Sequence, residues 1–413
     1  MKHLNRWVYA IIGVIVLIFA GMVYAWTVLS SPIAAQFTEW SKADLSLTFT
    51  IVMFFFCIGT FLGGIFQKKM KVKWLAWIAA VLFILGFFIA SRATSLMVLY
   101  AGFGVLGGLG SGFSYSAVLS SVTKWFPDKQ GLMSGILLMG FGIGSFIIGK
   151  IYTAVTPSDG GEAWRTSFLV LGIICFVVLG VSGFFTRIPD PSWQAPAPKK
   201  AKAQKEIYEE INTVTMLKRP SFWLFFFWAI FLSAAGLAVV SQGTPMALEA
   251  CPDAAISDVA TIVGLISIFN GIGRIIFGLL YDKIGRTLTM LLGGIVFIAA
   301  MLLVLWALTS HSMTILVISY ITVGLGYGCV TPTNSAFTYQ YYGSKDYPTN
   351  LSIINMNLLI ASFGSTIAGA IFDATNSYVT IIIVVLALIV VGTILSFLIR
   401  KPKPKAKDEP KVM

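Results

Sequence analysis

Twelve apolar stretches, each about 20 residues or longer, constrain this chain more than any other feature of its sequence. A helix of that length crosses the roughly 30 Å hydrocarbon core of a bilayer and satisfies its own backbone hydrogen bonds. Apolar residues make up 57% of the chain and charged residues 11%, unlike a soluble domain. We therefore predict an all-α integral membrane protein with twelve transmembrane helices. The predicted spans are 7–30, 44–67, 73–91, 96–122, 130–154, 164–186, 220–247, 256–281, 286–309, 312–339, 348–374 and 377–400.

The positive charges alternate along the chain and indicate its orientation. Lysines and arginines gather after the second, sixth and last spans, whereas the intervening loops nearly lack them. This positive-inside pattern predicts that both termini and the 187–219 segment are cytoplasmic. It also explains the net charge of +12 without nucleic acid, because the basic clusters lie where lipid headgroups are. The first span is too long for a cleaved signal sequence, so we expect it to be retained.

The residues that usually carry catalysis or metal binding form no recognisable set. The four cysteines are scattered without paired or metal-like spacing, and both histidines lie near predicted membrane surfaces. Serine, histidine and acidic residues show no catalytic arrangement. The sequence therefore predicts neither an enzyme nor a bound cofactor or metal.

The 187–219 segment divides the chain into two sets of six spans. It opens with four prolines, which favour an extended linker, and becomes amphipathic from 206 to 217, which indicates an interfacial helix. Related loops follow the second span (64–71) and the eighth span (278–286), 214 residues apart, as in parallel six-helix repeats. The predicted domains are a six-helix bundle over 1–186, the cytoplasmic linker over 187–219, a second bundle over 220–400 and a basic cytoplasmic tail over 401–413.

One charged residue, Arg274, is predicted to lie deep inside the membrane. The acidic residues all fall in loops or at span ends, so none is available there to neutralise it. An unpaired cation in hydrocarbon is costly, which suggests that its counter-ion is an anionic substrate. The alternative is snorkelling, since Arg274 lies seven residues, or about 10 Å, from the inner end of its span.

Two loops carry recognisable motifs. At the junction of the eighth and ninth spans, Gly278, Asp282, Lys283, Gly285 and Arg286 resemble the loop signature of the major facilitator superfamily. There the aspartate can pair with a basic residue across the interface of the two halves and latch one state. In the first-half copy the aspartate position is glutamine, which puts that latch in doubt. The second loop, 124–131, has a proline and then Asp128 at the start of the fifth span, a favourable helix start.

Together with Tyr24-Ala-Trp26 and the stretch from Asn270 to Arg286, these motifs resemble the oxalate/formate antiporter family, a prokaryotic relative of the monocarboxylate porters. The resemblance covers the whole chain and implies a major facilitator fold in a prokaryotic plasma membrane. It implies that Arg274 binds the substrate carboxylate through a bidentate fork. It also implies that the cavity is lined by Asn270, Tyr24, Tyr115 and Tyr327, and that Asp282, Lys283, Arg286 and Asp128 take part in gating.

The sequence departs from that family at informative positions. Members that carry oxalate have a lysine in the eleventh span, where residues 350–362 contain no cation. Val23 and Val323 stand where family members have a glutamine and an aromatic residue. The pocket is expected to contain amide groups, Asn355 or Asn357 among them. One positive charge suits a monoanion. The proton-coupled relatives have an aspartate at Asn270, which puts proton symport through this position in doubt.

The sequence thus predicts a monomeric secondary transporter of small monocarboxylates such as lactate, pyruvate or formate, working by alternating access. Oxalate/formate exchange is the alternative within transport, and a proton or an exchanged anion is the expected coupling partner. A membrane receptor that does not transport is the alternative from another class. Glycines crowd the fourth, fifth and tenth spans, which favours either static close packing or helices that slide during transport.

Overall fold

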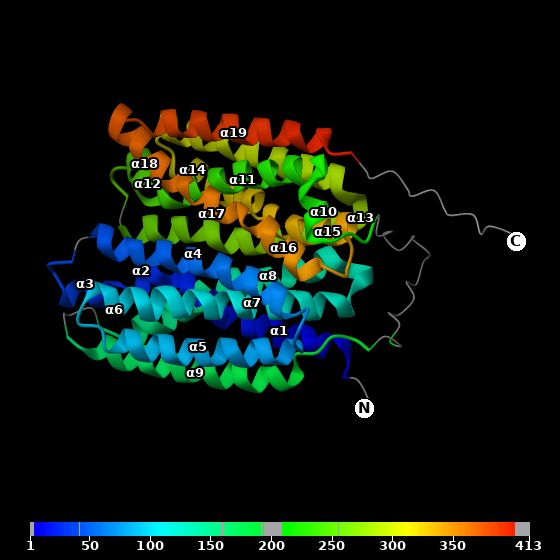
Figure 1. Ribbon diagram of the computed structural model, residues 1–413. Helices are drawn as coiled ribbons and strands as arrows, with labels where there is room; N and C mark the ends of the chain where they lie inside the picture. The colour runs from blue at the N-terminus through cyan, green and yellow to red at the C-terminus, as the bar shows by residue number, and fades with distance from the viewer. Residues whose placement is uncertain are drawn as a thin grey trace, which may run out of the picture.

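The computed structural model describes residues 4–40, 42–157, 161–190, 193, 209–254 and 256–400. These residues form helices and no strand, as predicted (Figure 1). The helices of the first half are α1 (Arg6–Ala20), α2 (Trp26–Leu29), α3 (Ser31–Gln36), α4 (Lys42–Phe66), α5 (Val72–Ser91), α6 (Leu96–Leu99), α7 (Gly108–Val122), α8 (Gln130–Val155) and α9 (Ala163–Phe185). Short 3-10 turns and the π-helix Tyr100–Gly107 connect several of them.

The second half repeats this helical pattern with more interruptions. The segment Val330–Tyr342 continues the helix before it after a break at Gly328 and Cys329, and the eleventh predicted span is divided into three pieces. The helices are α10 (Thr213–Leu217), α11 (Pro220–Ser241), α12 (Gly243–Ala250), α13 (Ile256–Ser310), α14 (Met313–Tyr327), α15 (Val330–Tyr342), α16 (Tyr347–Asn355), α17 (Asn357–Ala361), α18 (Phe363–Thr375) and α19 (Tyr378–Leu398).

Helix α13 comprises two membrane spans joined by a sharp reversal. Its apolar part, Thr261–Ser310, has 50 residues, and a straight helix of that length would measure about 75 Å. The backbone breaks at Gly285, where φ is 80° and ψ is 179°, a conformation that glycine adopts without steric cost. Gly273 and Phe297, each 12 residues from this break, contact neighbouring residues of α14, so the chain doubles back. The eleven long apolar segments of the described chain thus make twelve spans.

Each half has its own hydrophobic core. One core is built from residues between Tyr9 and Leu179, joined by Tyr347 and Leu351 of α16, and the other from residues between Met216 and Ile399. In Figure 1 the first half, blue to green, lies below the second half, which ends in red. Helices α8 and α13 form a main contact between the halves. Two separately packed bodies that meet along a few helices can move relative to one another.

The linker corrects one prediction. Helix α10 covers only Thr213–Leu217, and Glu209–Asn212 are not helical, so the helix predicted from 206 to 217 is too long. The Asn212 side chain accepts a hydrogen bond from the Thr215 amide at 2.9 Å and so caps the helix. The Ile211 amide donates to the Tyr342 carbonyl at 3.2 Å, which holds the segment extended against the second half. Most of the proline-rich stretch and the basic tail lie outside the described residues.

Candidate functional site

Arg274 lies on α13 at the interface between the halves. Its Nη1 donates a hydrogen bond to the backbone carbonyl of Leu138 on α8, which belongs to the other half. The side chain is half-buried and makes no ion pair with any described residue. Its Nε is buried and has no hydrogen-bond partner in this part of the chain. A half-buried guanidinium with an unsatisfied donor can form charge-assisted hydrogen bonds with an anion.

The three tyrosines named from the sequence lie near this guanidinium. Tyr24, Tyr115 and Tyr327 all lie close enough to Arg274 to interact with it electrostatically, although they come from three different predicted spans. Tyr24 occupies a 3-10 turn, Gly21–Ala25, that interrupts the first span. Tyr24 and Tyr327 are half-buried, and Tyr115 is buried. Their phenol groups can line a pocket with both ring surface and hydroxyl groups.

The three asparagines have different surroundings. Asn270 lies one helical turn from Arg274 and is 8% exposed, and its Oδ1 has no partner among the described residues. Asn355 donates to the Tyr115 hydroxyl at 3.1 Å, across the interface of the halves, and accepts from Asn334 at 3.2 Å. Asn357 instead accepts from Ser233 of α11 at 3.2 Å, within its own half. Asn355 is therefore hydrogen-bonded to the other half, whereas the described side-chain hydrogen bonds of Asn357 stay within its own half.

Phe141 on α8 is a central residue of this region that the sequence analysis missed. Its ring packs against Tyr24, Tyr115 and Phe56, with centroid separations of 5.4, 5.5 and 5.6 Å. A phenylalanine in an apolar span carries no sequence signal that separates a pocket wall from ordinary packing. Only its three aromatic neighbours identify it as the residue that supports two of the tyrosines.

The halves also meet at one end of the bundle, which we call the closed end and define by Asp282, Lys68 and Asp346. The carboxylate of Asp282 on α13 accepts hydrogen bonds from the amides of Gly131, at 2.9 Å, and Leu132, at 2.7 Å. These amides lie in the first turn of α8, where free N–H groups and the helix dipole favour an anion. Asp282 therefore links the two halves by accepting hydrogen bonds from backbone amides of α8.

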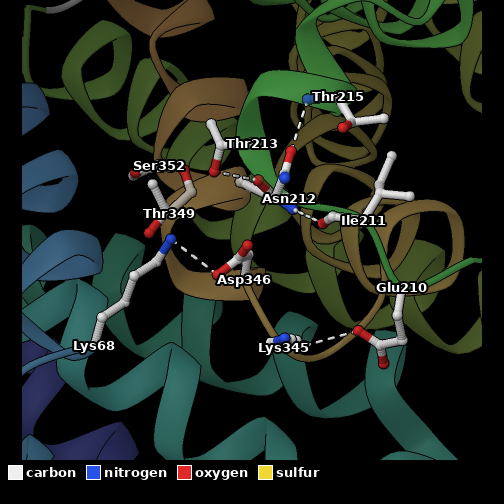
Figure 2. Close-up of polar contacts among 11 residues, drawn as sticks. Lys68, Glu210, Ile211, Asn212, Thr213, Thr215, Lys345, Asp346, Thr349 and Ser352 are labelled. Carbon is white, nitrogen blue, oxygen red and sulfur yellow. Dashed lines mark hydrogen bonds and ion pairs between the residues drawn. The ribbon is translucent and has the colours of Figure 1, made fainter.

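The first half contributes a different contact to the closed end. Gln67, at the position of the motif aspartate, bonds Ser116 within its own half, at 2.9 Å from Nε2 to Oγ. Its neighbour Lys68 forms an ion pair of 2.8 Å with Asp346, which precedes α16 (Figure 2). Figure 2 also shows Glu210 of the linker beside Lys345; Glu210 accepts from the Ser344 and Lys345 amides at 3.0 Å each. The linker therefore holds the loop that carries Asp346.

The other residues expected to act in gating lie within their own halves. Asp128 pairs with Arg6 through two contacts of 2.6 and 3.1 Å. Arg286 is buried and donates to the carbonyls of Ser396 and Ile399, at 2.8 and 2.9 Å, and so caps the end of α19. Lys283 is exposed. Of the four, Asp282 is the one whose described hydrogen bonds cross between the halves.

No group of three metal-binding side chains occurs in the described chain. Two helical halves around a half-buried arginine define an integral membrane protein of the transporter class. The family model of the Major Facilitator Superfamily matches residues 10–363 and 253–412. The chain is therefore a member of the Major Facilitator Superfamily, and its relatives and fold are those of transporters rather than enzymes. Its fold resembles that of the proton:xylose symporter XylE, with a TM-score of 0.73, 14% identity and coverage of 97% of this chain and 98% of that one.

Three relatives indicate which branch of the superfamily this chain is similar to. The chain is 25% identical to the uncharacterized MFS-type transporter YhjX of Escherichia coli over 87% of its length and 86% of the relative. It is 26% identical to the oxalate:formate antiporter of Oxalobacter formigenes, covering 83% and 80% of the two chains. It is 33% identical to monocarboxylate transporter 12 of Mus musculus over 27% of this chain and 22% of that one. These matches agree with the branch that the motifs indicated.

Proposed function

We propose that this protein transports small organic anions, with monocarboxylates such as lactate, pyruvate and formate as substrates, and that Arg274 binds the carboxylate. The observation that carries the proposal is a half-buried guanidinium at the interface of the halves, with an unsatisfied Nε and no ion pair in the described chain. Tyr24, Tyr115 and Tyr327 lie near it, and Asn270 lies one helical turn away on the same helix. Such a site supplies one charge and several neutral hydrogen-bonding groups.

We propose an alternating-access mechanism, which the way the halves meet supports. The contacts of Asp282 and Lys68 hold them together at the closed end, while Arg274 keeps part of its surface exposed. We propose that the closed end faces the cytoplasm, because the basic loops are predicted there. We propose that the protein acts as a monomer in a prokaryotic plasma membrane.

The charge of the site predicts its selectivity. One guanidinium neutralises a monoanion, but a dianion leaves a negative charge uncompensated in a medium of low dielectric constant. Lactate, pyruvate or formate is therefore expected to inhibit labelled substrate uptake into proteoliposomes at concentrations about tenfold lower than oxalate at neutral pH. Substrate-dependent accumulation of any of these anions separates a carrier from a receptor. Tighter binding of oxalate would favour the runner-up, oxalate/formate exchange, which the relative from Oxalobacter formigenes supports.

A lysine in the eleventh span provides the matched test of this charge argument. Leu358 is half-buried, whereas Asn357 is fully buried and bonded to Ser233, so Leu358 is the better position to change. Leu358→Lys is expected to shift preference toward dicarboxylates. Leu358→Gln, of similar length but uncharged, serves as the control and is expected to keep the monocarboxylate preference.

We propose that the carrier exchanges anions or facilitates their movement without a proton. An unpaired Arg274 disfavours the movement of the empty carrier, since that movement passes the charge through a closed interface. Proteoliposomes without internal anion are therefore expected to take up substrate slowly under an imposed pH gradient, and faster when preloaded with a monocarboxylate. Rapid uphill uptake into empty liposomes would instead indicate a boundary carboxylate such as Asp258 or Glu249. Partial burial raises the pKa of Glu249, with an opposing influence of His311.

A further inference from the structure

The guanidinium of Arg274 is oriented by one contact that leaves a particular edge free. Nη1 donates to the Leu138 carbonyl, while Nε has no partner and Nη2 makes no hydrogen bond within the described residues. Nε and Nη2 form one of the two edges through which a guanidinium binds a carboxylate in a bidentate manner. With Nη1 held on the Leu138 carbonyl, Nε and Nη2 are the pair of donors that remains without a partner among the described residues.

Gly142, one helical turn beyond Leu138 on α8, provides the space for this arrangement. A methyl group at position 142 would lie 3.0 Å from Nη1, 3.4 Å from Cζ and 3.8 Å from Nη2 of Arg274. Optimal contacts between nonbonded heavy atoms are roughly 3.5–4.0 Å, so the guanidinium would have to move. A methyl group at Gly149, further along the same helix, would meet its nearest neighbour, Val28, at an ordinary 3.7 Å.

We propose that Gly142 is a positioning residue for the substrate anion: its missing side chain lets Arg274 lie against α8, hold Nη1 on the Leu138 carbonyl and present Nε and Nη2 to the carboxylate. This inference rests on the proposed function. A methyl group at 142 displaces the guanidinium without changing any charge. The affinity for the anion is lost because the two donors no longer meet both carboxylate oxygens.

The test combines transport with a double-mutant cycle. Gly142→Ala is expected to raise the KM of monocarboxylate uptake by about tenfold, since a misplacement of about 1 Å can cost about a hundredfold and the displacement here is smaller. It should also reduce the shift in melting temperature that saturating substrate produces. Gly149→Ala, the matched control, is expected to change neither quantity.

The cycle separates positioning from general packing. Gly142→Ala is expected to lower the melting temperature of the substrate-free protein when Arg274 is present, and to lower it much less in an Arg274→Ala background, where no guanidinium obstructs the methyl group. If Gly142→Ala alone does not fold, the double variant is expected to recover folding. An equal loss in both backgrounds, or an unchanged KM in Gly142→Ala, overturns the proposal for Gly142. Wild-type protein that neither binds nor transports any monocarboxylate overturns the proposed function instead.

Discussion

Replacing Arg274 by alanine is expected to abolish both binding and transport of monocarboxylates. Loss of a buried, charge-assisted contact typically costs about 2–5 kcal/mol, which corresponds to an affinity loss of roughly 30-fold or more. The described chain offers no other cation at this site, because the remaining charged groups near the interface lie at the closed end. Binding is measured by the substrate-induced shift in melting temperature, and transport by uptake into proteoliposomes.

Lysine at position 274 is expected to restore little of this activity. An ammonium group is a point charge at a different reach, and it cannot hold the Leu138 carbonyl while presenting two parallel donors to a carboxylate. Arg92, an exposed residue near an outer helix end, allows a matched control, and Arg92→Lys should transport normally. If Arg274→Lys transported at the wild-type rate with unchanged affinity, Arg274 would not be the carboxylate site.

Removal of the Asp282 carboxylate is expected to open the closed end and slow transport. Hydrogen bonds to charged groups contribute about 1.5–3 kcal/mol each, and Asp282 accepts two from α8 amides. Even the loss of one such bond, about 2 kcal/mol, shifts a two-state equilibrium by roughly 30-fold. Asp282→Ala should therefore lengthen the distance between spin labels at Lys129 and Lys283, two exposed residues on either half. Asp282→Asn, which keeps an acceptor oxygen, is expected to fall between alanine and the wild type.

Removal of the Lys68–Asp346 ion pair, the other described contact at the closed end, is the comparison for Asp282→Ala. The Lys68 side chain is 45% exposed, and exposed pairs contribute about 0.2–1 kcal/mol and weaken with added salt. Lys68→Ala should therefore change the label distances and the transport rate much less than Asp282→Ala, and the effect of Lys68→Ala should become smaller still at high ionic strength. Equal effects of the two variants would show that Asp282 contributes no more than an exposed ion pair to closure.

Several features of the molecule could be predicted from local sequence because they depend on local physics. Hydropathy predicted the twelve spans, because a helix in lipid must present apolar side chains and satisfy its own backbone hydrogen bonds. The reversal between the eighth and ninth spans follows from the loop motif, in which Gly285 supplies a positive φ. The predicted helix from 206 to 217 failed because amphipathic periodicity does not include the contacts of Ile211 and Glu210 with the second half.

By itself, the sequence determined the all-helical membrane class and the arginine that no acid in the spans could neutralise, because burying a charge has a high cost wherever the helix packs. Tertiary structure alone decided how the polar and aromatic groups are arranged at the interface of the halves. The choice of Asn355 over Asn357, the support from Phe141 and the seat formed by Leu138 and Gly142 all depend on how α8, α13 and the α16–α17 break meet in space. The sequence shows that position 142 is a glycine, but only the packing of α8 against α13 shows which side chain lies in the space it leaves.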